Sequence, residues 1–235
     1  MQMAGKLYLI PSTIGDAGIE KVIPGYISEL INTLRIYIVE NERTARRTLI
    51  KMGIKTAIDK LEFLILDKHT DQADIPSYLA RIREEDAGLL SEAGAPAIAD
   101  PGSDIIRQAH DSHIEVIPLV GPSSILLAMM ASGMNGQNFA FVGYLPVKSH
   151  DRIRRIRILE QRSKTENQSQ IFIETPYRNN QMLQDLLKTC SPDTRLCIAC
   201  DLTSENGWVK TMSISAWKKQ SPELHKLPSI YILHG

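Results

Sequence analysis

The sequence predicts an α/β protein of two α/β domains, in which a parallel Rossmann-like sheet is followed by a mixed sheet. Short apolar runs rich in β-branched residues alternate with longer segments of helical periodicity, which is the pattern of βαβ units. The second half has fewer helical segments per strand, which favours a mixed sheet. The length of 235 residues exceeds the usual size of one domain, so two modest domains are expected.

The first domain is expected to cover residues 1–119. Pro24 stands near the first turn of one helical segment and Gly53 follows the last turn of the next, which are the positions these residues favour. The predicted strands are residues 7–10, 35–39, 62–66, 87–90 and 114–119, and the predicted helices are residues 24–34, 44–52, 75–84 and 104–111.

The second domain is expected to cover residues 120–235. The turn at 121–124 opens a strongly apolar helix over 125–131, with Ser as its N-cap, and marks the junction. The polar stretch 161–169 is predicted to be a surface loop. The other predicted strands are residues 139–142, 170–174, 194–199, 208–213 and 229–233, and the other helices are residues 149–161 and 179–187.

Composition narrows the classes of function. Lys plus Arg and Asp plus Glu number 27 each, so attraction to nucleic acid requires a local basic patch. The apolar run 7–10 is too short for a secretion signal or a membrane span, so we expect a cytoplasmic protein without membrane contact. Cys197 and Cys200 are predicted to point to opposite faces of one strand and to belong to the core, so no metal site is expected.

The candidate chemistry lies in loops that follow predicted strands. The chain has neither G-x-G-x-x-G after a strand nor G-x-x-x-x-G-K-[ST], so the common dinucleotide and phosphate loops are missing. Open parallel sheets bind ligands at the carboxyl ends of their strands, where Gly and Pro let the backbone come close to a ligand. Five segments have this position and composition: residues 11–16, 39–43, 90–102, 121–124 and 174–178.

Each segment also has an ordinary structural interpretation. The first can be a connector, 100–102 is a common turn, 121–124 can be a simple cap, and the charges around Arg43 are typical of a solvated helix face. Three carboxylates favour a functional interpretation, because Glu40, Glu92 and Glu174 stand at predicted strand ends, where they can accept hydrogen bonds from a ligand.

In this order, the segments resemble the signature loops of the tetrapyrrole methylase superfamily of S-adenosylmethionine-dependent methyltransferases. The most similar branch 2′-O-methylates a cytidine of small-subunit ribosomal RNA. Where that branch has T-P-I-G-N, A-E-D-T-R and S-D-A-G-T-P with D-P-G, this chain has Ser12-Thr-Ile-Gly-Asp16, Val39-Glu-Asn-Glu-Arg43 and Ser91-Glu-Ala-Gly-Ala-Pro96 with Asp100-Pro-Gly102. Where it has P-G-P-S, G-F-L-P and E-S-P-x-R, this chain has Val120-Gly-Pro-Ser123, Gly143-Tyr-Leu-Pro146 and Glu174-Thr-Pro-Tyr-Arg178. The resemblance extends over nearly the whole chain.

The resemblance implies a homodimer of two-domain subunits that bind S-adenosylmethionine in a cleft between the domains. Differences from the branch include Thr13, Asp16, Asn41 and Glu92, and the branch's small basic C-terminal domain is not found before Gly235. These differences concern the acceptor more than the donor. The donor contacts implied by the resemblance are Pro11, Glu92, Ala95, Ser123, Ser124, Thr175, Asp201, Leu202 and Pro228.

A ribose hydroxyl that attacks a methyl group needs a base to accept its proton. The candidates are Glu40 and Glu174, with Arg43 and Arg178 holding flanking phosphates, and His69 is a weaker choice.

Three functions follow from these residues. The first is methylation of ribosomal RNA, aided by a basic helix over residues 152–157 together with Arg43 and Arg46. The second is methylation of a tetrapyrrole or another small molecule by an enzyme of the same superfamily, which the neutral charge favours. The third is a regulatory module that binds the donor without catalysis.

Overall fold

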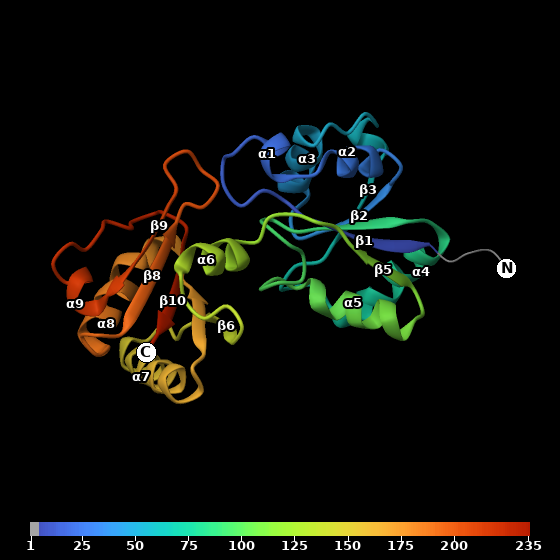
Figure 1. Cartoon of the computed structure of the whole chain (residues 1–235). Coiled ribbons are helices and arrows are strands. Elements are labelled where there is room, and N and C mark those ends of the chain that lie inside the picture. Colours follow the sequence, from blue (N-terminus) through green and yellow to red (C-terminus); the bar gives the residue numbers. More distant parts are fainter. Residues whose placement is uncertain (1–4) are drawn as a thin grey trace. The chain divides into compact units, whose positions relative to one another are not determined.

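A computed structural model describes residues 5–235 and divides the chain into two units (Figure 1). Unit 1 is Met1–Ser123 and unit 2 is Ser124–Gly235. The expected boundary near Leu119 lies in the loop directly before this division. Within residues 5–235, no helix combines the length and the apolar character that crossing a membrane requires.

Unit 1 contains a parallel sheet of five strands in the order β3-β2-β4-β1-β5. The central strand β4 is buried at every position, which explains its uninterrupted apolar sequence Ala-Gly-Leu-Leu. Because the strands are parallel, all of their carboxyl ends meet at one edge of the sheet. The strands are β1 (Lys6–Ile10), β2 (Ile36–Val39), β3 (Glu62–Ile65), β4 (Ala87–Leu90) and β5 (Glu115–Pro118).

Helices cover both faces of this sheet. Along β2, Ile36 and Ile38 join the core beneath α4 and α5, whereas Tyr37 and Val39 join the core beneath α2 and α3, as the alternation of strand side chains requires. The helices of unit 1 are α1 (Ile19–Val22), α2 (Gly25–Ile31), α3 (Glu42–Lys51), α4 (Ile75–Glu84) and α5 (Gly102–Asp111), with 3-10 turns η1 (Ile58–Lys60) and η2 (Gln72–Asp74).

Unit 2 contains a mixed sheet in the order β6-β7-β10-β8-β9. The first two strands pair in parallel, whereas β10 is antiparallel to both of its neighbours. The beginning of β10 therefore lies beside the carboxyl ends of β7 and β8. The strands are β6 (Phe139–Tyr144), β7 (Ser169–Ile173), β8 (Arg195–Cys200), β9 (Trp208–Ser213) and β10 (Ser229–His234).

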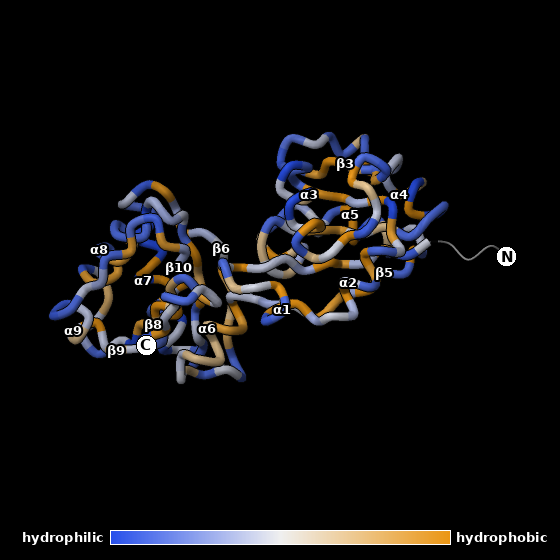
Figure 2. Tube along the Cα trace, turned by 90° about the horizontal axis from the view of Figure 1, so that it is seen from above, coloured by the Kyte–Doolittle hydropathy of each residue, from blue (hydrophilic) through white to orange (hydrophobic). Residues whose placement is uncertain are grey.

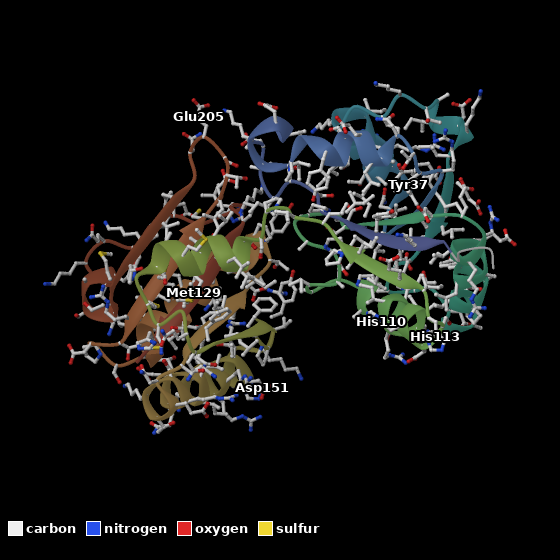
Figure 3. The ribbon with its side chains drawn as sticks, turned by 45° about the vertical axis from the view of Figure 1, so that its right-hand side comes forward. Tyr37, His110, His113, Met129, Asp151 and Glu205 are labelled. Carbon is white, nitrogen blue, oxygen red and sulfur yellow. The ribbon has the colours of Figure 1, made fainter. Side chains whose placement is uncertain are left out.

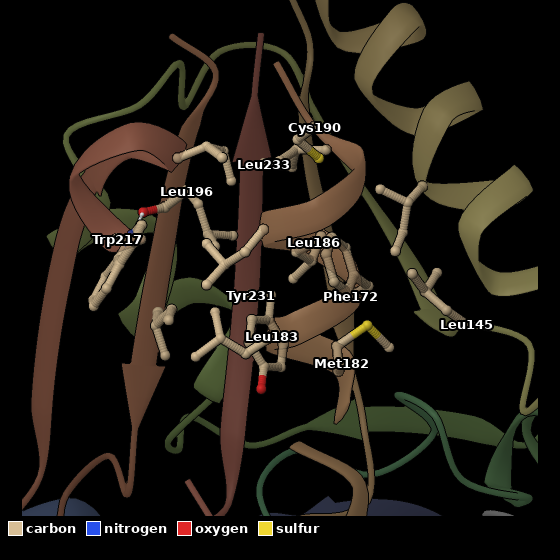
Figure 4. Close-up of a cluster of buried hydrophobic side chains, with 14 of the residues drawn as sticks. Leu145, Phe172, Met182, Leu183, Leu186, Cys190, Leu196, Trp217, Tyr231 and Leu233 are labelled. Carbon is tan, nitrogen blue, oxygen red and sulfur yellow. Dashed lines mark hydrogen bonds between the residues drawn. The ribbon is translucent and has the colours of Figure 1, made fainter. Parts of the chain in front are cut away.

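The larger core of unit 2 lies between this sheet and the helices α7, α8 and α9, around Phe172, Tyr231 and Trp217 (Figure 4). A smaller core on the other face packs against α6. Hydrophobic residues follow the strands of both units (Figure 2). The helices are α6 (Ser124–Ser132), α7 (Ser149–Glu166), α8 (Asn179–Thr189) and α9 (Ile214–Trp217), with the 3-10 turn η3 (Pro176–Arg178).

The predicted fold class is confirmed by the parallel sheet and the mixed sheet. The loop predicted over 161–169 is wrong, because α7 continues to Glu166 and β7 begins at Ser169. Polar residues on the inner side of α7 hid this continuation: Glu160 and Ser163 are buried and hydrogen-bonded rather than solvated. The prediction for the cysteines is confirmed, since Cys197 and Cys200 are buried in different cores on opposite faces of β8.

Candidate functional site

Three loops meet at the carboxyl edge of the unit 1 sheet. Ser12, after β1, and Gly94, after β4, form a two-residue antiparallel bridge whose N–H to O distances are 2.9 and 3.1 Å. The buried Ser12 hydroxyl donates to the carbonyl oxygen of Ser91 at 2.6 Å, and the Ser91 hydroxyl donates to that of Gly94 at 2.8 Å. These bonds hold the loops after the neighbouring strands β1 and β4 against each other.

The third loop, after β5, packs on the first through Gly121. A Cβ atom at this position would lie 2.3 Å from Cβ of Pro11, so only glycine allows the two loops to approach this closely. Pro11 is buried, and Ser123 follows in the same loop as the last residue of unit 1.

Asp100 organises the long loop after β4. Its Oδ1 atom accepts hydrogen bonds from the backbone N–H groups of Ala97 and Gly102, each at 2.8 Å. Burial raises the pKa of this carboxyl, although the two hydrogen bonds oppose the rise. Asp100 therefore shapes the turn that begins α5, as the ordinary interpretation of this segment expects.

Glu92 and Ala95 lie in the same loop with different surroundings. Ala95 is half-buried, whereas Glu92 is exposed at the end of the buried strand β4. Because β2 is the neighbour of β4, Glu40 at the end of β2 lies close enough to Glu92 to experience its charge.

The half-buried carboxyl of Glu40 has unusual electrostatics. Burial raises its pKa, and the negative charges of Asp100, Glu92 and Asp67 raise it further. Deprotonated, such a carboxylate is a stronger base than an ordinary surface glutamate. His69 is exposed, and its backbone N–H donates to Asp67 at 2.8 Å, which is a turn contact.

The arginines predicted after Glu40 lie on the first turns of α3. Asn41 caps this helix by accepting a hydrogen bond from Thr44 N–H at 3.1 Å, so Asn keeps the capping function at a position where the branch that the sequence resembles has Asp. Arg46 pairs with Glu42 and lies 5.1 Å from the centre of the Phe63 ring. Arg43 is exposed and lines a shallow hollow with Asn41, Glu42, Arg46 and Arg47.

In unit 2, Glu174 follows β7 and its side chain has no exposed surface. Its Oε1 atom accepts hydrogen bonds from the Arg178 guanidinium at 2.5 Å and from Thr175 N–H at 2.7 Å. The hydrogen bond to Glu174 raises the pKa of Arg178. Within the described residues, Glu174 Oε2 and Arg178 Nε have no hydrogen-bond partner, so the pair keeps bonding capacity for another polar group.

A second turn lies at the same edge of unit 2. Asp201 N–H donates to the carbonyl oxygen of Pro228 at 2.8 Å, which joins the end of β8 to the beginning of β10. Leu202 and Thr203 continue this turn toward a loop with Glu205 at its tip (Figure 3). The buried Thr203 hydroxyl has no hydrogen-bond partner in the described part of the chain.

The predicted residues thus form two groups, each within one unit. Unit 1 brings together Pro11, Glu92, Ala95 and Ser123, with Glu40 and Arg43 on the neighbouring strand and helix. Unit 2 brings together Glu174, Thr175, Arg178, Asp201, Leu202 and Pro228, and Ser124 is the first residue of α6. The sequence offered no signal for Thr203, whose polar side chain becomes unusual only through its burial.

The basic segment 152–157 needs a correction. Arg152 was expected on a charged surface, but it is buried and pairs with Asp185 at 2.5 Å. One of its Nη atoms also donates to the carbonyl oxygen of Val147 at 2.6 Å. Arg154 and Arg157, on the outer side of α7, are exposed. The periodicity of a helix places Arg152 beneath this surface.

Comparisons with known proteins agree with the resemblance inferred from the loops. No protein-family model matches the chain. Relatives named ribosomal RNA small subunit methyltransferase I include one from Vibrio cholerae, 27% identical over 233 residues, covering 97% of this chain and 77% of the relative. Another, from Xylella fastidiosa, is 30% identical over 187 residues, covering 79% of this chain and 64% of the relative.

Solved structures share the fold. Native uroporphyrin III C-methyltransferase from Thermus thermophilus has a TM-score of 0.58 and 15% identity, covering 98% of this chain and 97% of its own. The methyltransferase CobJ has a TM-score of 0.60 and 15% identity, with 99% and 95% covered. The Thermus enzyme in complex with S-adenosylhomocysteine has a TM-score of 0.54 and 14% identity, with 98% and 97% covered. The resemblance predicted from the sequence is confirmed.

Proposed function

We propose that this chain, with the fold of the tetrapyrrole methylases and the relatives described above, is an S-adenosylmethionine-dependent methyltransferase that acts on the RNA of the small ribosomal subunit. The observation that carries the proposal is the set of loops fixed around the Ser12–Gly94 bridge, which resemble the donor loops of the superfamily in both order and sequence. The names of the relatives support the same reaction and the same substrate.

Each unit has chemical groups that suit parts of such a donor. Its ribose hydroxyls and amino group need acceptors, and the exposed Glu92 carboxylate can provide one. In unit 2, Glu174 Oε2 and Thr203 Oγ1 have no hydrogen-bond partner within residues 5–235 and can bind polar atoms of a ligand, since buried polar atoms without partners are costly. We propose that the donor contacts Pro11, Glu92, Ala95, Ser123, Ser124, Thr175, Asp201, Leu202 and Pro228.

The donor supplies a methyl group on a sulfonium, which an oxygen nucleophile takes by direct displacement. The protein must align the nucleophile, exclude water and accept a proton. Glu40 is the better candidate base, because burial and neighbouring negative charges raise its pKa and no residue pairs with its carboxylate in the described chain. The carboxylate of Glu174 is already bound by Arg178. Arg43, beside Glu40 on α3, is the candidate for holding an acceptor phosphate.

Binding to RNA requires positive surface on a chain without net charge. The arginines of α3 and the exposed Arg154 and Arg157 of α7 supply two such surfaces. Arg152 is excluded from this role by its burial against Asp185. Phosphate contacts from these surfaces would position the RNA without reading its sequence.

We also propose that the protein is a homodimer and works in the cytoplasm. Dimerisation follows from the resemblance to the superfamily, and the exposed apolar side chains of Leu126 and Met130 on α6 support it. The cytoplasm follows from the ribosomal substrate of the relatives. Light scattering of the purified protein tests the dimer, because a monomer at micromolar concentration would contradict it.

The second candidate is methylation of a tetrapyrrole or another small molecule. The solved structures with this fold that act on uroporphyrin favour it. The same methyl-transfer assay separates the two substrates. Purified protein and radiolabelled donor are incubated with small ribosomal subunits from a strain that lacks the gene, and in parallel with uroporphyrinogen III. Label in the ribosomal RNA supports the proposal, and label only in the tetrapyrrole overturns it.

A further inference from the structure

Exposed aromatic side chains gather at one edge of unit 2. Tyr144 ends β6 and Tyr177 lies in η3 directly after β7, and their exposed fractions are 56% and 71%. Because β6 and β7 are parallel neighbours, with Tyr144 in register with Ile173, both tyrosines lie at the carboxyl edge of the sheet. Tyr144 lies close enough to Arg178 to contribute, after the larger effect of the hydrogen bond to Glu174, to the raised pKa of that guanidinium.

The backbone holds this group in place. Lys226 N–H donates to the carbonyl oxygen of Pro176 at 3.0 Å, which ties the segment before β10 to η3. The Tyr177 and His225 rings then meet at 6.3 Å between centroids, with an angle of 71° between their planes. This edge-on arrangement leaves ring surface uncovered for a third aromatic group. We call Tyr144, Tyr177 and His225 the aromatic edge.

The exposed tyrosines of the aromatic edge do not belong to the hydrophobic core of unit 2, so core packing does not explain why they are aromatic. Tyr231, by contrast, is fully buried and its hydroxyl bonds to Asn179. A tyrosine that remains 71% exposed stabilises the fold little, so its removal should be tolerated. Exposed large apolar groups that cluster mark a binding surface more often than single ones do.

The charges around the aromatic edge favour an anionic partner. Arg178 is one third exposed, and Lys148 and Lys226 are exposed. Two carboxylates near these cations already have partners: Glu174 is buried against Arg178, and Glu223 is hydrogen-bonded to Asn180 and to His225 N–H. Aromatic rings between cationic side chains are the combination with which proteins bind single-stranded nucleic acid, because bases stack on the rings while phosphates meet the cations.

We propose that the aromatic edge stacks an unpaired base of the RNA acceptor, with Tyr177 as its main ring. The inference rests on the proposed function and adds to it that the acceptor region must be unpaired. Bases within an A-form duplex are stacked on their neighbours and offer no free face, so a duplex of the same sequence cannot use this site.

The test compares Tyr177→Ala, Tyr177→Phe and Phe139→Ala in binding to a single-stranded RNA oligonucleotide and to its duplex. Phe139 is the matched control, because it is a partly exposed aromatic residue at the opposite end of β6. Loss of one stacked base weakens binding to the single strand by roughly 5-fold to 100-fold. Tyr177→Phe and Phe139→Ala should keep the wild-type affinity for the single strand, and duplex binding should be unchanged in every variant.

Calorimetry with S-adenosylhomocysteine and a melting curve distinguish an error in the stacking site from an error in the proposed methyltransferase function. If Tyr177→Ala binds the single strand as tightly as the wild type does, the stacking site is wrong while the methyltransferase proposal stands. If the variant loses affinity for the nucleoside or melts early, Tyr177 is structural and the stacking site is again wrong. If the wild-type protein binds no RNA at all, both proposals fail together.

Discussion

The carboxylate of Glu174 and the guanidinium of Arg178 form an ion pair at 2.5 Å, in which the Glu174 side chain has no exposed surface and that of Arg178 is 36% exposed. Two residues with separate roles in the sequence-based prediction, a base and a phosphate ligand, therefore neutralise each other. Glu174 Oε2 and Arg178 Nε, which have no hydrogen-bond partner in the part of the chain that the structure describes, still offer one acceptor and one donor at the edge of unit 2.

Removing only the cation of this pair should destabilise unit 2. Arg178→Met leaves a buried carboxylate without its partner, which costs roughly 3 to 5 kcal/mol for fully buried pairs, and the partial exposure of Arg178 places the expected loss near the lower end. Urea denaturation measures it. The double change Glu174→Gln with Arg178→Met should recover most of the loss. A single variant as stable as the wild type would show that the pair does not support the fold.

Gly121→Ala tests the contact between the first and third loops of unit 1. The new Cβ would lie 2.3 Å from Cβ of Pro11, so one loop must move, at a cost of about 1 to 3 kcal/mol. We expect a lower melting temperature and weaker binding of S-adenosylhomocysteine. Gly25→Ala is the control, since nothing lies within 4 Å of its added Cβ, and it should be neutral or slightly stabilising. Equal effects of the two variants would contradict the packing argument.

The raised pKa of Glu40 predicts an effect on activity. If Glu40 is the base, the methylation rate should fall as the pH drops through its raised pKa. Glu40→Gln should lower kcat by roughly 100-fold to 10,000-fold without changing the affinity for the donor. It should also remove the acid limb of the pH–rate profile, which is the fall in rate at low pH. If the variant keeps both the wild-type rate and the fall in rate at low pH, a group other than Glu40 accepts the proton.

The same pKa shift predicts an opposite effect on stability. A carboxyl whose pKa is higher in the folded than in the unfolded chain stabilises the fold while both states are protonated, and this stability is lost as the pH rises through the folded pKa. Glu40→Gln should therefore raise the melting temperature at neutral pH, and the gain should vanish below the ordinary pKa of 4.5. A Gln variant that melts earlier than the wild type at pH 7 would reverse the sign and refute the burial argument.

Glu92→Ala should weaken binding of the donor without changing the melting temperature, because the side chain is exposed and contributes little to packing. Loss of a hydrogen bond to a charged group corresponds to roughly 10-fold to 100-fold in affinity. Asp111→Ala, an exposed acid at the end of α5, is the control and should leave calorimetric affinity unchanged. Glu92→Ala should also lower the pKa of Glu40, because it removes one neighbouring negative charge. The fall in methylation rate at acidic pH should therefore move to lower pH.

The exposed arginines of α7 predict how RNA binding depends on salt. Reversing charge at Arg154 and Arg157 should abolish methylation of ribosomal subunits and leave donor binding intact. Each lost phosphate contact should reduce the log-log salt slope of RNA affinity by roughly 0.7 to 0.9. RNA affinity that stays flat between low and physiological salt would instead favour a small-molecule acceptor.

Most of the fold was predictable because its elements carry strong local patterns. The strand Ala87–Leu90 is apolar throughout and Ile75–Glu84 is a regular amphipathic helix, and both predictions match the structure residue for residue. The end of α7 was missed because its inner face is polar there: Glu160 accepts hydrogen bonds from Thr194 and from Ser191 N–H. Such partners lie far along the chain, so no local pattern reveals that a polar residue is buried.

The candidate site was predictable only as a set of loops. Strand ends identified Glu40, Glu92 and Glu174, since position along a strand is a local property. The pairing of Glu174 with Arg178, the burial of Arg152 and the unpartnered Thr203 depend on side-chain direction and on contacts between distant segments. Sequence spacing alone does not determine these contacts.

The position of β10 has a consequence for synthesis of the protein. This strand is the last of unit 2 in sequence but lies between β7 and β8, so neither of those strands can complete its hydrogen bonding before residues 229–234 have left the ribosome. Unit 1 closes its sheet as soon as β5 has emerged, long before that point. During translation, a folded first unit therefore precedes a second unit whose strands β7 and β8 still expose unpaired edges.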